Sequence, residues 1–162
     1  MIADTIENLP IEDLGPVAEI HAACFHDAWG AGMLRQVLGM PGAFGLVARW
    51  GARGSMIGFA LARVVADECE LLSLGVAPQH RARGVGRELL IAAMARAADA
   101  DARNLFLEVA ENNVAALKLY RAHGLVQIGQ RPEYYETPDG RRTMALTMRC
   151  DLPGRGGAVP GR

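Results

Sequence analysis

The most constraining feature of the chain is a basic, glycine-spaced loop that joins an apolar run to a helix-forming run. The apolar run ends at Val76, and the loop reads Arg81-Ala82-Arg83-Gly84-Val85-Gly86-Arg87. This order predicts a strand that leads into a helix. Gly84 and Gly86 let a ligand approach the backbone closely, and the first turn of a helix offers unpaired N–H groups and the positive end of the helix dipole. The segment therefore predicts a phosphate or pyrophosphate site.

Two well-known phosphate motifs do not fit this loop. The pattern G-x-x-x-x-G-K-[ST] is absent, and the dinucleotide fingerprint G-x-G-x-x-G fails at its third glycine, where Leu89 stands. A third pattern, Arg/Gln-x-x-Gly-x-Gly, is met by residues 81–86. Taken alone, these six residues leave a second interpretation open, which is a glycine-rich turn from strand to helix whose arginines bind nothing.

The apolar periodicity of the rest of the chain predicts a mixed α/β fold. Helices are expected over residues 30–38, 85–98 and 113–123, and strands over residues 43–49, 56–64, 68–77, 104–109, 126–131 and 143–149. The first three strands form an antiparallel meander, and the helix at 85–98 makes a parallel crossover to the next strand. We therefore expect a mixed central sheet flanked by helices, antiparallel in its N-terminal part and parallel at the glycine-spaced loop.

A further helix is expected before these elements. Pro10 can open this helix at its first position, and apolar residues then recur at spacings of three and four, at Leu14, Val17, Ile20 and Cys24. Pro16 lies within that stripe, and we expect it to break or restart the helix.

The composition fits one globular domain outside a membrane. The chain has 162 residues, of which 51% are hydrophobic, and a formal net charge of −1. This apolar content supports a packed core, and the low net charge makes bulk attraction to nucleic acid or to an anionic membrane a weak explanation for function. No apolar run of about 18 residues occurs, so no membrane-spanning helix is expected. The first residues also lack the pattern of a signal peptide.

The cysteines and the C-terminal composition complete this expectation. Cys24, Cys69 and Cys150 lie far apart, and an odd, sparse set indicates reduced thiols and a cytoplasmic location. Residues 1–152 are expected to form a single unit. Pro153–Arg162 is rich in glycine and proline and is expected to be a flexible tail.

A second segment matches the loop in family terms. It begins with the strand-end acid Glu108, continues through Asn113, and reaches Tyr120 in a pattern Ala-x-x-Leu-Tyr-x-x-x-Gly that ends at Gly124-Leu125. Together with residues 81–86, this segment resembles the GNAT superfamily of N-acetyltransferases, and the resemblance covers about residues 10–152. It implies a GNAT-like sheet, acetyl-CoA as cosubstrate and no metal.

Within that superfamily the chain is most similar to the RimI group of bacterial enzymes, which acetylate the N-terminal alanine of a small-subunit ribosomal protein. The matching stretches are residues 24–29, 70–76, 107–109 and 131–135. The resemblance implies the N-terminal segment of such a protein as the partner. One departure is Arg141-Arg142, which stands where the group commonly carries an acidic pair. A lysine side chain or a small amine therefore stays open as the acceptor, and so does a non-catalytic acyl-CoA sensor.

The resemblance also implies roles for single residues. Glu108 would be the general base, directly or through a water, and Tyr120 the acid that faces the departing sulfur. The alternatives are an exposed strand-end acid and a packed helix aromatic. The Leu74-Gly75-Val76 backbone would donate to the thioester carbonyl next to a local bulge. The loop from Arg81 to Arg87 would hold the pyrophosphate.

The remaining candidates have two interpretations each. Asn113 would bind the pantetheine arm or cap the following helix. Tyr134 and Tyr135 would wall the acceptor groove or fill a hairpin face. His21 and His26 are expected to be surface or core histidines, and Cys69 a small core residue. The chain has no Cys-x-x-Cys, His-Glu-x-x-His or Gly-x-Ser-x-Gly motif, which argues against zinc and serine-hydrolase chemistry.

Overall fold

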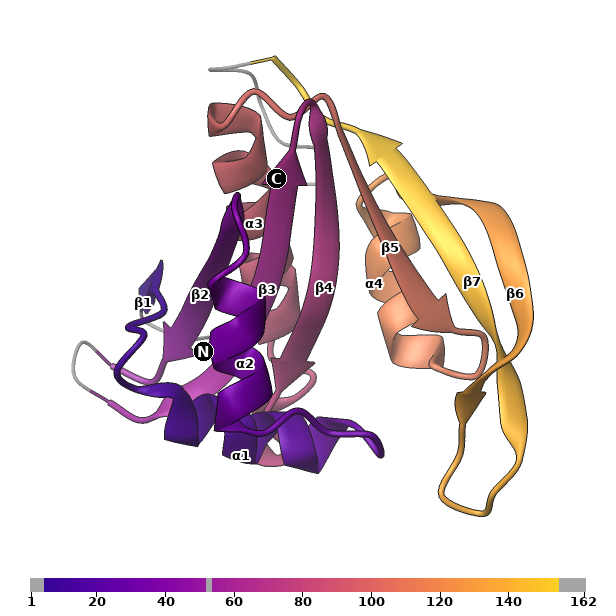
Figure 1. The fold of residues 1–162 in the computed structure, drawn as a ribbon, viewed down its shortest axis with the longest axis horizontal. Helices are drawn as coiled ribbons and strands as arrows, with labels where there is room; N and C mark the ends of the chain where they lie inside the picture. Colours follow the sequence, from indigo (N-terminus) through magenta and orange to yellow (C-terminus); the bar gives the residue numbers. More distant parts are fainter. Residues whose placement is uncertain (1–4, 52–53, 155–162) are drawn as a thin grey trace.

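A single mixed sheet organises the molecule, which is described here by a computed structural model over residues 5–51 and 54–154. The sheet has seven strands in the order β1-β2-β3-β4-β5-β7-β6 (Figure 1). The strands are β1 (Thr5–Asn8), β2 (Ala43–Arg49), β3 (Met56–Val65), β4 (Glu68–Val76), β5 (Asn104–Ala110), β6 (Val126–Glu136) and β7 (Arg142–Asp151). All neighbouring pairs are antiparallel except β4 and β5, which confirms the predicted meander and the predicted parallel crossover.

Helices cover both faces of this sheet. The helices are α1 (Leu14–Cys24), α2 (Ala31–Leu38), α3 (Val85–Asp99) and α4 (Val114–Ala122), and a short 3-10 helix, η1, spans Pro78–His80. α1 and α2 pack on one face with Phe59 and Leu61, and α3 and α4 pack on the other with Ala60 and Ala62 (Figure 1). Because successive side chains of a strand point to opposite faces, the apolar run of β3 supplies both cores at once.

The first helix differs from its prediction. α1 begins at Leu14, and Pro10 lies before it in a turn that the Asp13 N–H closes on the Pro10 carbonyl at 3.0 Å. Pro16 neither breaks nor restarts α1, because it occupies the first turn of the helix. The N–H groups of a first turn have no partner within the helix, so proline removes nothing there.

The C-terminal hairpin is longer than predicted and irregular. β6 runs to Glu136, and its pairing with β7 shifts between Arg131 and Tyr135. Glu133, inside this shift, has a φ of 54°. The extra residues of β6 bring Tyr134 and Tyr135 to the end of the sheet that carries Glu108. β1 and η1 were not predicted, since four and three residues are too few for a periodic signal.

β4 parts from β5 soon after the two strands meet. Their pairing covers only Glu68–Glu70 with Asn104–Phe106, and Figure 1 shows the two strands diverging beyond this point. A bulge also interrupts β4, because Leu71 pairs with Ala62 whereas Ser73 pairs with the adjacent Leu61. The extra residue is Leu72, so the bulge predicted at Leu74–Val76 lies further upstream. The physical reason is that pairing register, which places a bulge, depends on the partner strand.

The last described residues leave the sheet at the end of β7, which lies between β5 and β6. Leu152 is buried, and its N–H donates to the Arg103 carbonyl at 2.8 Å. Pro153 and Gly154 have no regular structure, and residues 155–162 of the predicted tail lie outside the described part of the chain. Within residues 5–51 and 54–154, no helix has the length and apolar character that crossing a bilayer requires.

Candidate active site

The glycine-spaced loop forms a bare backbone turn at the N-terminus of α3. Ala82 and Gly84 have φ values of 61° and 85°, and no side chain caps the helix. A Cβ added at Gly86 would lie 3.6 Å from Leu119 and 3.7 Å from Leu74, which is ordinary contact. The protein itself therefore tolerates a side chain at position 86, and a glycine there leaves room for something else. These contacts also show that the loop, β4 and α4 adjoin one another.

The three loop arginines are exposed and make contacts within the protein. Arg81 turns back toward β4, where its Nε donates to the Val76 carbonyl at 3.0 Å and its Nη2 to the Cys24 thiol at 3.3 Å. The Arg83 guanidinium lies 5.8 Å from the centre of the Trp50 ring. Arg87 pairs with Glu88 at 3.3 Å. The loop thus carries three positive charges, of which that of Arg87 is paired with Glu88.

The end of β4 offers backbone groups on its open side. Leu74, Gly75 and Val76 pair with β3, but the described residues give them no partner strand on the β5 side. Gly75 is required there, because an added Cβ would lie 2.7 Å from the Phe59 ring and 3.1 Å from the Cys24 sulfur. A strand with a free side and a close-packed glycine can accept an extended ligand along its edge.

Glu108 lies on β5 where the two strands have parted. Its neighbours Leu107 and Val109 belong to the core under α3 and α4, so Glu108 points to the opposite face. Its carboxylate forms an ion pair with Arg131 of β6. Burial and the charge of Glu108 raise the pKa of Glu70 on β4, so these two carboxyl groups lie within electrostatic reach of each other.

Tyr120 approaches the same region from α4. Its side chain is buried, and its pKa is raised by burial and by the nearby Tyr135 phenol. Burial, the charge of Glu108 and Tyr134 raise the pKa of Tyr135 to about 12. Glu108 and Tyr120 thus both lie within electrostatic reach of Tyr135. Glu108 points to the face of the sheet opposite α3 and α4, whereas Tyr120 belongs to the core on the α3 and α4 face.

The two β6 tyrosines line this region as an aromatic pair. Their rings meet edge to face at 5.1 Å, and the Arg131 guanidinium lies 4.2 Å over the Tyr134 ring. Tyr134 is exposed, whereas Tyr135 is half-buried. Arg131 therefore joins Glu108 to the tyrosine pair.

Asn113 caps α4, as one of its two interpretations predicts. Its side-chain oxygen accepts a hydrogen bond from the Ala116 N–H at 3.2 Å. Because the oxygen serves as a cap, the amide nitrogen is the group that stays available for a ligand.

Three positions near the site were not recognised in the sequence as partners of the candidate residues. Arg131 and Glu70 contact the Glu108 environment only because β4, β5 and β6 are brought together by long-range pairing. His21 was expected to be a surface or core histidine; it is buried and bonded to Ser73 of β4 at 3.2 Å. No local spacing reports any of these contacts. Cys69 is a buried core residue, as predicted, and burial raises its pKa to about 12.

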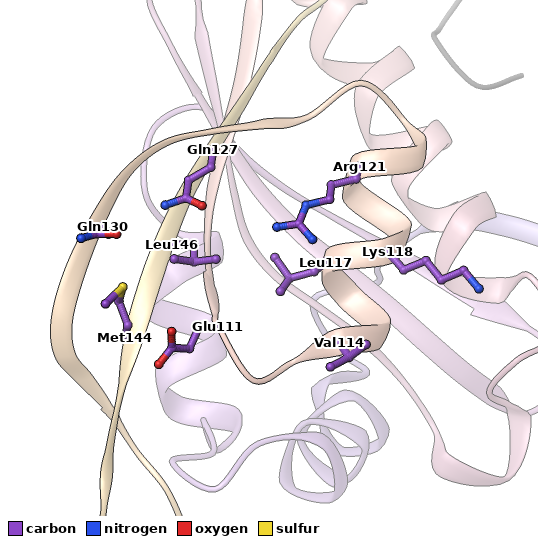
Figure 2. A pocket seen from close by; sticks show the side chains of 9 residues that line it. All are labelled: Glu111, Val114, Leu117, Lys118, Arg121, Gln127, Gln130, Met144 and Leu146. Atoms are coloured by element: carbon purple, nitrogen blue, oxygen red, sulfur yellow. The ribbon is translucent and has the colours of Figure 1, made fainter.

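A hollow on the described surface lies elsewhere. It measures about 780 Å³ and is enclosed by α4 on one side and β6 and β7 on the other, with Leu117, Arg121, Gln127 and Met144 in its wall (Figure 2). None of the site residues predicted from the sequence lines it. Among residues 5–51 and 54–154, no group of three or more His, Cys, Asp and Glu side chains is arranged to hold a metal ion.

A mixed seven-stranded sheet with a bare, basic, glycine-spaced turn at the N-terminus of α3 fits the class of acyltransferases that use acetyl-CoA. The chain belongs to the Acetyltransferase (GNAT) family, which matches residues 14–125, and it is an acyltransferase.

The chain is also similar to individual enzymes within this family. The chain is 34% identical over 147 residues to the [ribosomal protein bS18]-alanine N-acetyltransferase of Haemophilus ducreyi, which covers 91% of this chain and 99% of that protein. It is 34% identical to the N-alpha-acetyltransferase RimI of Mycobacterium tuberculosis, over 91% of this chain and 92% of that protein. The crystal structure of the ribosomal-protein-S18-alanine N-acetyltransferase from Escherichia coli superimposes with a TM-score of 0.84 at 29% identity, over 94% and 96% of the two chains.

Proposed function

We propose that this enzyme acetylates the N-terminal α-amine of a protein, with alanine as the first residue and a small-subunit ribosomal protein as the partner. The observation that carries the proposal is the similarity, over 91% of the chain, to an enzyme named for ribosomal protein bS18 and alanine. Glu108 and Tyr120, which would serve this reaction, both lie within electrostatic reach of Tyr135. The reduced thiols fit the cytoplasm, where ribosomal proteins are made.

An α-amine suits this site better than a lysine does. The amine must be neutral to attack a carbonyl. A terminal amine has a reference pKa of about 7.7–8.0, so roughly a tenth is neutral at pH 7, whereas a lysine with a pKa near 10.4 is neutral about four times in ten thousand. A single carboxylate such as Glu108 therefore needs to deprotonate a much smaller excess of charged amine when the acceptor is an α-amine than when it is a lysine.

Glu108 would take the proton from the acceptor amine, directly or through a water. Its exposed neighbour Arg131 holds the carboxylate from one side. Glu70, whose pKa is raised by burial and by Glu108, is a second carboxyl group within electrostatic reach of Glu108.

Tyr120 would hydrogen-bond to the departing sulfur. A phenol with a pKa of about 10 is already a weaker acid than a thiol at about 8.5. Burial raises the pKa of Tyr120 further, so complete proton transfer to a thiolate is uphill. The role supported by the structure is a hydrogen bond that stabilises negative charge on sulfur, with the proton supplied later by solvent.

The residues present fit acetyl-CoA, which supplies an activated acetyl group as its thioester. The turn from Arg81 to Arg87, with bare backbone at Gly84 and Gly86, would hold the pyrophosphate by its N–H groups and its positive charge. The free side of Leu74–Val76 would donate a backbone hydrogen bond to the carbonyl. The Asn113 amide nitrogen would contact the pantetheine arm. Tyr134 and Tyr135 would wall the acceptor groove.

Mass spectrometry of short peptides incubated with acetyl-CoA tests this function. A peptide with a free N-terminal alanine should gain 42 Da, the mass of an acetyl group replacing hydrogen, on its α-amine. The matched peptide with a blocked N-terminus and an internal lysine should stay unmodified. Acetylation of the blocked peptide alone would move the assignment to lysine, and tight acetyl-CoA binding without transfer to any amine would favour an acyl-CoA sensor.

One observation keeps a second acceptor class in the test. Arg141 and Arg142 of the β6–β7 hairpin are exposed, and they replace the acidic pair expected from the family resemblance. A basic hairpin alters the charge that an approaching peptide meets. The acceptor panel should therefore include small amines beside ribosomal N-terminal sequences.

A further inference from the structure

The last turn of α1 holds β4 at the place where β4 is bulged. The His21 ring bonds to Ser73 with 3.2 Å between Nε2 and Oγ. One helical turn later, the Cys24 thiol donates to the Val76 carbonyl at 3.3 Å, and Cys24 also packs against Gly75. Successive residues of β4 are thus held from the α1 face.

The geometry assigns the direction of the His21 bond. The Trp29 backbone N–H donates to His21 Nδ1 at 3.0 Å. A backbone N–H can only donate, so Nδ1 is an acceptor and a neutral ring carries its hydrogen on Nε2. His21 therefore donates to Ser73. The ring is 3% exposed and lies between Phe25, Trp29 and Phe59, at centroid distances of 4.6, 5.0 and 5.5 Å.

Ser73 occupies a position that gives this bond its effect. The extra residue at Leu72 turns Ser73 toward α1, and Leu74–Val76 follows directly. Pairing of β4 with β5 ends at Glu70. The stretch that would hold the thioester carbonyl therefore lacks one of the two strands that position a residue inside a sheet, and its place depends on β3 and on the contacts from α1.

We propose that His21 and Ser73 form a positioning pair that fixes the Leu74–Val76 backbone for the thioester carbonyl. Through Trp29, the pair also ties this backbone to the connection between α1 and α2. The proposal rests on the function proposed above, because it takes Leu74–Val76 as the carbonyl-binding segment. Neither residue touches the reacting atoms, so both act through the strand.

A double-mutant cycle tests the pair. His21→Phe keeps an aromatic ring in the buried position but removes both hydrogen bonds, and Ser73→Ala removes the hydroxyl alone. Each variant should raise the acetyl-CoA dissociation constant and lower kcat by about five-fold each. This is the size of effect expected for one lost hydrogen bond. The double variant should be no worse than His21→Phe alone, because His21→Phe already removes the bond to Ser73. Ser73→Thr keeps the hydroxyl and should restore most of the loss, which a loss of packing would not allow.

Hydrogen exchange separates this proposal from the proposed function. In the ligand-free protein, Ser73→Ala should speed exchange at residues 72–76 while leaving exchange in α3 unchanged. Ser55→Ala, an exposed serine in the β2–β3 connection, is the matched control and should alter neither exchange nor acetyl-CoA affinity. Unchanged exchange and affinity in Ser73→Ala, or additive losses in the double variant, would overturn the pair. If the wild type binds acetyl-CoA but acetylates no amine, the proposed function fails, and these two measurements still decide the pair.

Discussion

At the scale of single residues, the chemistry of the site depends on contacts between strands that are far apart in the sequence. Glu108 of β5 pairs with Arg131 of β6, and Glu70 of β4 senses the charge of Glu108. The sequence identified Glu108 and Tyr120 through a family motif. It could not identify Arg131 or Glu70 as their neighbours, because no local spacing encodes the pairing of β4, β5, β7 and β6.

Removing the two candidate catalytic groups should slow transfer with little change in the fold. Glu108→Gln removes the base and should lower kcat by about 10²-fold or more. Tyr120→Phe removes one hydrogen bond to the sulfur while keeping the buried ring, and should lower kcat by about ten-fold. Steady-state rates with saturating acetyl-CoA measure both effects. Rates equal to wild type would remove these residues from the mechanism.

The buried His21 should make stability depend on pH. Burial lowers the pKa of His21, whereas the unfolded chain titrates near 6.5. Between these two pKa values the unfolded state binds more protons, so the free energy of unfolding falls as the pH falls below about 6.5, by at most about 1.4 kcal/mol per pH unit. Urea titrations of wild type and His21→Phe between pH 5 and 7.5 should show this slope only in the wild type. Parallel slopes in the two proteins would contradict the assignment.

At the scale of elements, predictions succeeded where the apolar pattern was long and failed where partners set the geometry. β2 has the predicted bounds, and β3, α3 and β5 differ from theirs by a residue. The bulge at Leu72 and the shift in β6 were not visible in the sequence, because a register shift is a property of two strands together. Pro16 was misjudged for a different reason, since the start of α1 decides whether a proline is harmful.

Two glycines of the site should respond to alanine in opposite ways. Gly75→Ala forces a Cβ to within 2.7 Å of Phe59 and should lower the free energy of unfolding by about 1–3 kcal/mol. Gly86→Ala meets only ordinary contacts within the protein, so its stability should be unchanged or higher by about 0.5–1 kcal/mol. Its acetyl-CoA affinity should nevertheless fall by about ten-fold or more, because the new methyl group occupies space that the glycine leaves for the pyrophosphate. Thermal melts measure the stability of both variants, and calorimetric titration measures their acetyl-CoA affinity. Normal affinity in Gly86→Ala would contradict the assignment of Gly86 to the pyrophosphate site.

At the scale of the whole molecule, two cores share one sheet. The core under α3 and α4 extends from Phe44 of β2 to Met148 of β7, and the core under α1 and α2 is confined to the N-terminal half. The mixed sheet and its flanking helices could be predicted from alternating helix and strand patterns. The unequal extent of the two cores could not, because it depends on where β4 and β5 part.

The cysteines should report separately on local and global opening. Cys69 and Cys150 are buried, with pKa values that burial raises to about 12 and about 11. Cys24 is only partly buried. A thiol reagent should therefore label Cys24 in the native protein and the other two only when the sheet unfolds, because thiolate is the reactive form. Mass analysis of labelled peptides checks the order, with Cys24→Ser as the control, and early labelling of Cys69 would contradict the described core.

The early parting of β4 and β5 has a consequence for how the enzyme responds to occupancy. Only three residue pairs join the two strands, so the sheet is continuous at one end of this strand pair and open at the other. A ligand that lies between β4 and β5 and hydrogen-bonds to both strands would link the two parts of the sheet. The bound substrate would then help to hold β4 and β5 together during each turnover. Its release would remove this link between the two strands.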